Sequence, residues 1–314
     1  GMFGNNIHRK FMNSKKVLIL GANGMLGKMM SLYFSSLNDY STVLTSRESS
    51  NFLINNFDDN LEVFNVVEDD FQSLASRVKP DIIINCIGRI KPTINEEDNL
   101  SITETIKINS FFPMELQKYS KTNKIHYFQI GTDCVFSGKK GNYLEDDFQD
   151  ADDLYGKSKI VGEIPAENKL IIRSSIIGPE SGDGRSLLNW FIKNNSEEVS
   201  GFKNHLWNGV TTLNFSKVVQ GIINNENYNF DLQHLIPGNS VNKAELLKLI
   251  KNNFEKEIKI NEINAENLVN RTLETHSKQI NEQLWLQAGY ENIPTVQDNI
   301  KELADSKFTE LILN

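Results

Sequence analysis

The stretch Lys16-Val-Leu-Ile-Leu-Gly-Ala-Asn-Gly-Met-Leu-Gly27 decides the fold. It begins with a short apolar run of the kind that is buried in a parallel sheet, and residues 25–37 then follow the pattern of a helix. Strand, glycine turn and helix in this order place backbone amides and a helix N-terminus around a pyrophosphate. Gly21, Gly24 and Gly27 would let the backbone approach that group and let the helix pack on the strand.

The spacing of the glycines distinguishes this turn from a nucleoside-triphosphate loop. Such a loop has the pattern G-x-x-x-x-G-K-[ST]. Here five residues lie between Gly21 and Gly27, and Lys28 is followed by Met29. The turn therefore predicts a dinucleotide site.

Apolar runs and helical patterns alternate as far as residue 173. This alternation predicts an α/β fold with a Rossmann-like doubly wound parallel sheet and a smaller α/β lobe over the crevice. Residues 15–173 with about 210–230 would form the first domain, and residues 174–209 with 231–314 the lobe. The predicted strands are residues 16–20, 42–45, 61–67, 80–88, 125–130, 169–173 and 232–236, the predicted helices are 71–78, 100–121, 151–163, 185–193, 213–223 and 243–254, and residues 176–184 and 199–212 are predicted to be irregular.

Composition and charge limit the class of protein. Of 314 residues, 41 are Asp or Glu and 33 are Lys or Arg, and the sequence pI is near 5.3. This acidic balance argues against a nonspecific grip on nucleic-acid phosphates. No apolar run approaches the roughly 18 residues needed to span a bilayer, so we expect no membrane segment.

Cysteine and histidine usage predicts no metal site, because the two cysteines and five histidines show no metal-ligand spacing. Cys86 and Cys134 lie in apolar contexts, which fits reduced thiols in a cytoplasmic protein. Gly1 before Met2 resembles a cloning remnant, and we expect residues 1–14 to be flexible.

Ser46 and Arg47 follow the second predicted strand, about twenty residues beyond the glycine turn. An acidic residue there would bind the ribose hydroxyls of NAD, whereas an arginine suits the 2′-phosphate of NADP. Arg47 therefore favours NADPH, and the adjacent Glu48 keeps NADH as the alternative. Residues 85–88 end the fourth strand and would face the same crevice.

Tyr155 and Lys159 are four residues apart in a predicted helix. Their side chains therefore project from one face, where the ammonium could lower the pKa of the phenol. Thr132 follows the fifth strand and would reach the same edge of the sheet. The pair is a candidate proton donor beside the dinucleotide site.

Four motifs in this order resemble the extended short-chain dehydrogenase/reductases, and within them the dTDP-4-dehydrorhamnose reductase branch. The resemblance covers residues 16–215 well and the rest loosely. The motifs are Gly21-x-x-Gly24-x-x-Gly27, Asn85-Cys-Ile-Gly88, Gly131-Thr-Asp-Cys-Val-Phe-Ser-Gly138 and Tyr155-Gly-Lys-Ser-Lys159-x-x-Gly-Glu163.

The resemblance implies NAD(P)H-dependent reduction of a 4-keto nucleotide-activated deoxysugar for surface polysaccharides, and a homodimer. Thr132, Tyr155, Lys159 and Asn109 would serve catalysis. The implied substrate contacts are Thr132, Asp133, Cys134, Arg185, Trp207 and Asn208. The implied cofactor contacts are Gly21, Asn23, Gly24, Met25, Leu26, Gly27, Ser46, Arg47, Asn85, Cys86, Ile87, Gly88, Tyr155, Lys159 and Arg173.

Two departures from the branch make a different 4-keto sugar an alternative. Cys134 stands where the branch usually has a tyrosine, and residues 205–212 replace its later sugar-contact pattern. Arg185, Lys203 and His205 are candidates for the substrate diphosphate. Two other functions stay open, an NAD-dependent epimerase or dehydratase that has the same triad, and a non-catalytic NADP-binding subunit like the relative that regulates methionine adenosyltransferase.

Overall fold

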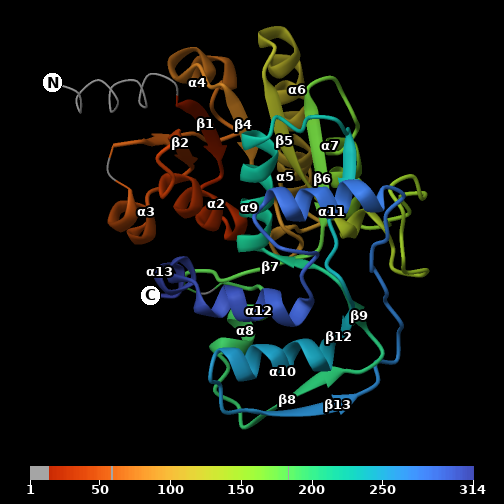
Figure 1. The fold of residues 1–314 in the computed structure, drawn as a ribbon. Helices are drawn as coiled ribbons and strands as arrows, with labels where there is room; N and C mark the ends of the chain where they lie inside the picture. The colour runs from red at the N-terminus through yellow and green to blue at the C-terminus, as the bar shows by residue number, and fades with distance from the viewer. Residues whose placement is uncertain (1–13, 58, 183) are drawn as a thin grey trace, which may run out of the picture.

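The computed structural model describes residues 14–57, 59–182 and 184–314 (Figure 1). Its centre is a seven-stranded sheet in the order β11-β6-β5-β4-β1-β2-β3, and every neighbouring pair is parallel. The order reverses between β1 and β4, which is where a doubly wound sheet opens a crevice. The predicted α/β architecture is confirmed. The strands are β1 (Lys15–Leu20), β2 (Tyr40–Ser46), β3 (Leu61–Val63), β4 (Ile82–Asn85), β5 (His126–Thr132), β6 (Lys169–Ser174) and β11 (Leu232–His234).

The apolar run of β1 is continuous because the sheet is buried on both faces. Val17 and Ile19 point to one side and Leu18 and Leu20 to the other, and all four are fully buried. The first side is covered by α2 (Met25–Ser35), α9 (Thr212–Asn224) and α11 (Lys278–Gln287), and the second by α4 (Phe71–Val78) and α6 (Phe112–Asn123).

The helix predicted at residues 100–121 is interrupted by a π-helical turn. It consists of α5 (Asn99–Ile106), the π-turn η2 (Lys107–Phe111) and α6. Pro113 has no N–H to donate to the Asn109 carbonyl one turn earlier, which favours this irregularity. The freed carbonyl faces α7 (Leu154–Gly162), and a Cβ added at Gly162 would overlap it.

A smaller layer of structure lies below the sheet in Figure 1. There β8 (Glu198–Phe202) pairs in parallel with β13 (Lys259–Ile263), and α10 (Lys243–Asn253) packs on β8. The remaining α-helices are α3 (Asn51–Asn56), α8 (Leu187–Ile192), α12 (Val296–Asp305) and α13 (Lys307–Leu313). The short strands pair as β7 (Ile176–Ile177) with β10 (Val210–Thr211) and as β9 (Leu206–Trp207) with β12 (Val241–Asn242), and two 3-10 helices are η1 (Lys91–Thr93) and η3 (Asp133–Val135).

The structure corrects several predicted boundaries. β11 and α11 belong to the range 231–314 that we assigned to the lobe, yet β11 pairs with β6 as the outer strand of the main sheet and α11 packs on one face of that sheet. The predicted strand at 61–67 ends at Val63, and the irregular stretches contain β7 to β10. The rest of the domain division stays a prediction, and the expectation for residues 1–13 lies outside the described residues.

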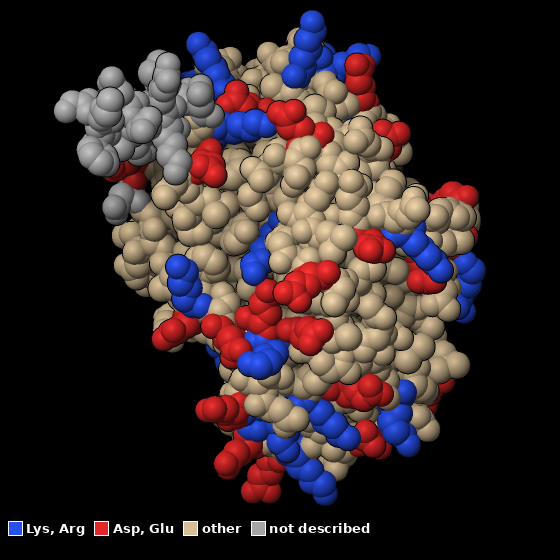
Figure 2. Space-filling model, viewed as in Figure 1, with Lys and Arg blue, Asp and Glu red and all other residues tan. Residues whose placement is uncertain are grey.

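In the described ranges, no helix is long and apolar enough to cross a bilayer. The same ranges contain no group of three or more His, Cys, Asp or Glu that could hold a metal ion. On the described part of the face in Figure 2, Lys and Arg are interspersed with Asp and Glu, and no continuous basic surface forms.

Candidate active site

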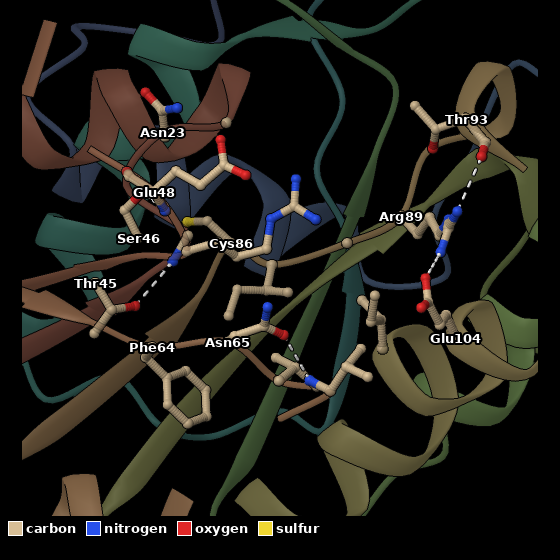
Figure 3. Close-up of a pocket in the computed structure, with 18 of the residues that line it drawn as sticks. Asn23, Thr45, Ser46, Glu48, Phe64, Asn65, Cys86, Arg89, Thr93 and Glu104 are labelled. Carbon is tan, nitrogen blue, oxygen red and sulfur yellow. Dashed lines mark hydrogen bonds and ion pairs between the residues drawn. The ribbon is translucent and has the colours of Figure 1, made fainter. Parts of the chain in front are cut away.

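A cleft of about 500 Å³ opens at the carboxyl ends of β1, β2, β3 and β4 (Figure 3). Loops after these strands line it, as expected for the crevice of a doubly wound sheet. Eight of the predicted cofactor residues line this cleft: Gly21, Asn23, Gly24, Ser46, Arg47, Cys86, Ile87 and Gly88.

The three glycines of the turn have different physical roles. Gly21 has a φ of +82°, and a Cβ there would lie 2.9 Å from the Cys86 carbonyl carbon. A Cβ at Gly27 would overlap the Gly21 carbonyl oxygen, so Gly27 lets α2 pack against the turn. Gly24 is not crowded in this way, and its backbone lines the cleft.

Three of the predicted cofactor residues adjoin the cleft in the chain but do not line it. Asn85 is buried, donates from Nδ2 to Gln129 Oε1 at 3.0 Å, and accepts from the Ile87 N–H at 3.1 Å. Met25 and Leu26 begin α2, and Leu26 packs in the core beneath the turn. None of the three is among the residues that line the cleft.

Some residues of the cleft were missed from the sequence. Thr45 Oγ1 accepts from the Gly21 N–H at 3.3 Å, and Asn65 Oδ1 accepts from the Val67 N–H at 2.9 Å. Arg89 donates to Glu104 Oε2 at 2.7 Å at the other end of the cleft (Figure 3). The sequence placed Asn65 inside a strand predicted to run to residue 67. In the structure that strand ends at Val63, and Asn65 lies in the following loop, which lines the cleft.

Thr132 lies on β5, and Tyr155 and Lys159 lie on α7, which packs against β5; none of the three is among the residues that line the cleft. Thr132 ends β5, and Tyr155 lies in the first turn of α7, which Asp153 caps by accepting from the Gly156 N–H at 2.8 Å. The side chains of Thr132 and Tyr155 lie near each other, and Thr132 Oγ1 accepts from the Cys134 N–H at 3.1 Å. Lys159 Nζ donates to the Ile130 carbonyl at 3.3 Å.

Asn109 joins the loop after β4 to α7. Its Oδ1 accepts from the Arg89 N–H at 2.7 Å, and its Nδ2 donates to Ser158 Oγ at 3.1 Å. The side chain is buried within the π-turn, which aims it at both partners. Asn109 therefore fixes the helix that carries Tyr155 and Lys159.

The predicted lowering of the Tyr155 pKa by Lys159 is wrong for this structure. Burial raises the pKa of Tyr155, and the neighbouring Thr132 side chain opposes the rise only partly. Burial also lowers the pKa of Lys159, against the opposing charge of Glu163. The ammonium is directed to the Ile130 carbonyl, and the removal of the phenol from water dominates.

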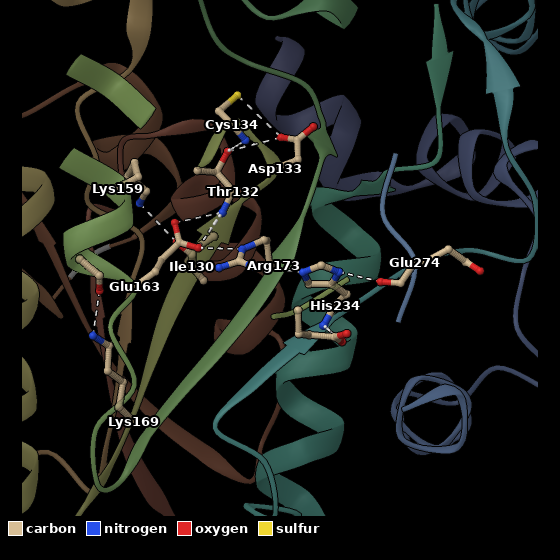
Figure 4. Close-up of polar contacts among 12 residues, drawn as sticks. Ile130, Thr132, Asp133, Cys134, Lys159, Glu163, Lys169, Arg173, His234 and Glu274 are labelled. Atoms are coloured by element: carbon tan, nitrogen blue, oxygen red, sulfur yellow. Dashed lines mark hydrogen bonds and ion pairs between the residues drawn. The ribbon is translucent and has the colours of Figure 1, made fainter. Parts of the chain in front are cut away.

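Arg173 does not face the cofactor cleft, so its predicted role is wrong. Its side chain is fully buried, and Nε donates to Glu163 Oε1 at 3.1 Å. Arg173 Nη1 lies 3.0 Å from His234 Nε2, and His234 Nδ1 lies 2.7 Å from the Glu274 carbonyl (Figure 4). Arg173 therefore belongs to a polar chain between β6 and β11.

A second pocket, of about 280 Å³, adjoins the catalytic candidates through Asp133. Trp207 and Asn208, two of the predicted substrate contacts, line it, but their polar atoms are already engaged within the protein. Trp207 Nε1 donates to Ser175 Oγ at 2.8 Å, and Asn208 Nδ2 donates to the Leu273 carbonyl at 2.8 Å. Cys134 lies next to Asp133, with 3.7 Å between its Sγ and Asp133 Oδ1.

Lys243 and Arg271 also line this second pocket, and the sequence did not single them out. Among the described residues, neither cation takes part in an ion pair. Burial raises the pKa of Asp133, and the charges of Arg271 and Lys243 oppose that rise. The pocket thus holds two cations and one carboxylate, a net positive charge within an acidic protein.

Of the cations predicted for a diphosphate, only His205 lines the second pocket. Arg185 is exposed and donates to the Pro92 carbonyl at 3.3 Å, and Lys203 is exposed beside β13. Lys243, at the start of α10, and Arg271, in the loop before α11, are far apart in the chain, and no sequence motif contains both.

Comparisons with known proteins fit this geometry. The family model described as the RmlD substrate binding domain matches residues 15–308. A dTDP-4-dehydrorhamnose reductase from Bacillus anthracis in complex with NADP is 18% identical with a TM-score of 0.70, covering 92% of this chain and 98% of that one. The Thermotoga maritima UDP-glucose 4-epimerase with UDP-glucose is 14% identical with a TM-score of 0.70, covering 92% and 97%. These likenesses establish the fold.

A curated relative matches a shorter part of the chain. Methionine adenosyltransferase 2 subunit beta from Danio rerio is 28% identical over 151 residues, which is 48% of this chain. The match spans 42% of that relative's length, so the chain aligns with less than half of it.

Proposed function

Since the chain belongs to the RmlD substrate binding domain family, we propose that it is an NADPH-dependent reductase of a 4-keto nucleotide-activated deoxysugar. The observation that carries the proposal is the position of Thr132 at the end of β5, next to the strand whose following loop lines the cleft, with Tyr155 on α7 packed against β5 and the cationic second pocket adjoining through Asp133. A dinucleotide in the cleft and an anionic sugar nucleotide in the second pocket could thus both reach the hydroxyl groups of Thr132 and Tyr155.

The cleft residues fit the cofactor. The turn from Gly21 to Gly24 would bring the pyrophosphate close to the backbone at the N-terminus of α2, and exposed Arg47 would bind the 2′-phosphate that distinguishes NADPH from NADH. Bound NADPH supplies the hydride.

The catalytic residues would handle the proton. Thr132 and Tyr155 would hydrogen-bond the keto oxygen and stabilise the charge that develops on it. Because burial raises the pKa of Tyr155, its phenol stays protonated at neutral pH and can donate that proton to the alkoxide. Lys159 would bind the nicotinamide ribose and stabilise the phenolate that remains.

The second pocket would bind the charged part of the substrate. Lys243 and Arg271 present two cations that have no ion-pair partner in the described chain, which suits a diphosphate. They replace Arg185 and Lys203 in this role. Cys134 would contact the sugar, and burial raises the pKa of its thiol to about 12, which keeps it neutral.

The test is NADPH oxidation with dTDP-4-keto-6-deoxy-L-mannose generated in situ, run beside a UDP-linked 4-keto sugar. Tyr155→Phe should lower kcat about 10²- to 10⁴-fold, because it removes the acid. Tyr119→Phe is the matched control, since Tyr119 packs in the core on the far side of the sheet. Near wild-type turnover by Tyr155→Phe would overturn the proposal, and turnover without net NADPH consumption would indicate an epimerase or dehydratase.

A non-catalytic subunit is the second candidate, favoured by the name of the curated relative. Tight NADPH binding without turnover on either sugar would support it. The homodimer and the cytoplasmic location stay predictions.

A further inference from the structure

Glu163 places a buried negative charge directly behind the catalytic candidates. It follows α7, eight residues after Tyr155, and its side chain is fully buried. Both carboxylate oxygens lie 3.4 Å from the Thr132 N–H, and Oε1 accepts from Arg173 Nε at 3.1 Å. Figure 4 shows the carboxylate between Thr132, Lys159 and Arg173.

The fold makes room for this carboxylate at Gly131. A Cβ there would lie 2.8 Å from Glu163 Oε1 and 3.0 Å from Arg173 Cα, so the glycine lets the carboxylate enter between β5 and β6. Arg173 is itself held by His234 Nε2 at 3.0 Å. Glu163 is therefore fixed by a chain of buried contacts that begins at β11.

In Figure 4 the Lys159 side chain points toward the Glu163 carboxylate. Lys159 is buried, and Glu163 is the carboxylate whose charge raises its pKa against the lowering by burial. Cys134 also faces Lys159, but its thiol is neutral. The other titratable groups that interact with Glu163 or Lys159 are Tyr127 on β5, Tyr155 on α7, and Lys169 and Arg173 on β6.

We propose that Glu163 is a positioning residue for the reduction, which holds the Thr132 backbone in place and sets a negative charge beside the Lys159 ammonium, with Arg173 and His234 anchoring its carboxylate. The inference rests on the proposed function for its kinetic readout. Loss of the carboxylate would remove the negative charge that opposes the effect of burial on Lys159, so Lys159 would release its proton more readily.

The experiment compares the pH dependence of kcat and KM in wild type, Glu163→Gln, Arg173→Met and the double variant. In both variants that lack Glu163, the decline of kcat at alkaline pH should begin about one pH unit or more lower than in wild type. Arg173→Met keeps the carboxylate and removes a competing cation, so its alkaline limb should stay or move upward. In Glu163→Gln, Arg173 stays buried without its ion-pair partner, which would itself destabilise the fold. The double variant removes that arginine and so separates the effect on titration from a loss of folding.

Glu167→Gln is the matched control, because Glu167 is an exposed glutamate near the same helix end, paired with Lys121 at the surface. It should keep the wild-type profile. A kcat that falls equally at every pH in both Glu163 variants would mean a structural role only and would overturn the inference.

A second readout does not depend on turnover. NMR titration of isotope-labelled lysine, with Lys159 assigned from Lys159→Arg, should show Lys159 losing its proton at lower pH in Glu163→Gln than in wild type. If wild type oxidises no NADPH, the proposed function fails while this titration still decides the inference. An unchanged Lys159 titration would overturn it.

Discussion

At the scale of single residues, His234 is a buried ring held neutral by a neighbouring cation. Arg173 Nη1 donates to Nε2, which leaves the proton on Nδ1 to donate to the Glu274 carbonyl. Burial and the Arg173 charge lower the pKa of His234 to about 4, below its ordinary value of 6.5. The unfolded chain therefore binds a proton between these two pH values that the folded chain does not.

This shift predicts a stability loss on acidification. Stability should fall as pH drops below 6.5, by about 2 kcal/mol between pH 7 and pH 5 from this group alone. Urea unfolding at the two pH values measures it, with His234→Gln as the comparison. The variant should lose less stability than wild type over this interval, and equal losses would contradict the prediction.

The two cations of the second pocket predict a substrate-binding defect. Lys243→Met should raise KM for the sugar nucleotide about 10- to 100-fold with a smaller change in kcat, because a charge-assisted bond to the diphosphate is lost. Arg271→Lys should cost less, since it keeps the charge.

Lys203→Met is the matched control, because that exposed lysine was a sequence candidate but lies outside the pocket. It should leave KM unchanged. Equal effects of the Lys203 and Lys243 variants in steady-state kinetics would refute the assignment.

Residues next to a motif could be predicted, whereas residues brought in by tertiary packing could not. Gly21, Cys86 and Asp133 each follow a recognisable strand, so the sheet delivers them to its edge. Lys243 and Arg271 reach their pocket through folding of distant segments. Arg173 was wrongly assigned because its strand position suggested the crevice, and only the structure shows the buried carboxylate that binds it.

At the scale of elements, the contact between η2 and α7 predicts a packing-sensitive site. A Cβ at Gly162 would overlap the Asn109 carbonyl, so Gly162→Ala must push the two elements apart. We expect a loss of about 1–3 kcal/mol in the free energy of unfolding, and lower kcat because α7 carries Tyr155. Lys157→Ala, at an exposed position of the same helix, should be nearly neutral in urea unfolding.

A Gly162→Ala variant with the same free energy of unfolding as Lys157→Ala would contradict this prediction, because it would show that η2 can move away from α7 without loss of stability. Pro113 inside a helical pattern is a sequence signal for this π-turn, because proline lacks the N–H that a regular helix needs there. The main sheet was predictable because its apolar runs are buried on both faces. The pairs β7–β10 and β9–β12 were not, since two-residue strands have no periodicity to detect.

At the scale of the whole molecule, the two pockets share no lining residue. The cleft is built from the loops after β1 to β4, and the second pocket from β9, the start of α10 and residues 269–272. A dinucleotide and a nucleoside diphosphate without its sugar would therefore bind without competing for side chains. Their effects on stability should add.

This independence is testable by thermal unfolding. At about 100 times its Kd, each ligand should stabilise the chain by about 2.7 kcal/mol, which corresponds to roughly 4 °C in Tm for a chain of 314 residues. NADPH and dTDP or UDP together should give the sum of the two shifts. Lys243→Met should lose the shift with the nucleoside diphosphate and keep the shift with NADPH. If NADPH abolished the nucleoside diphosphate shift in wild type, the two ligands would compete for one site and the two-pocket arrangement would be refuted.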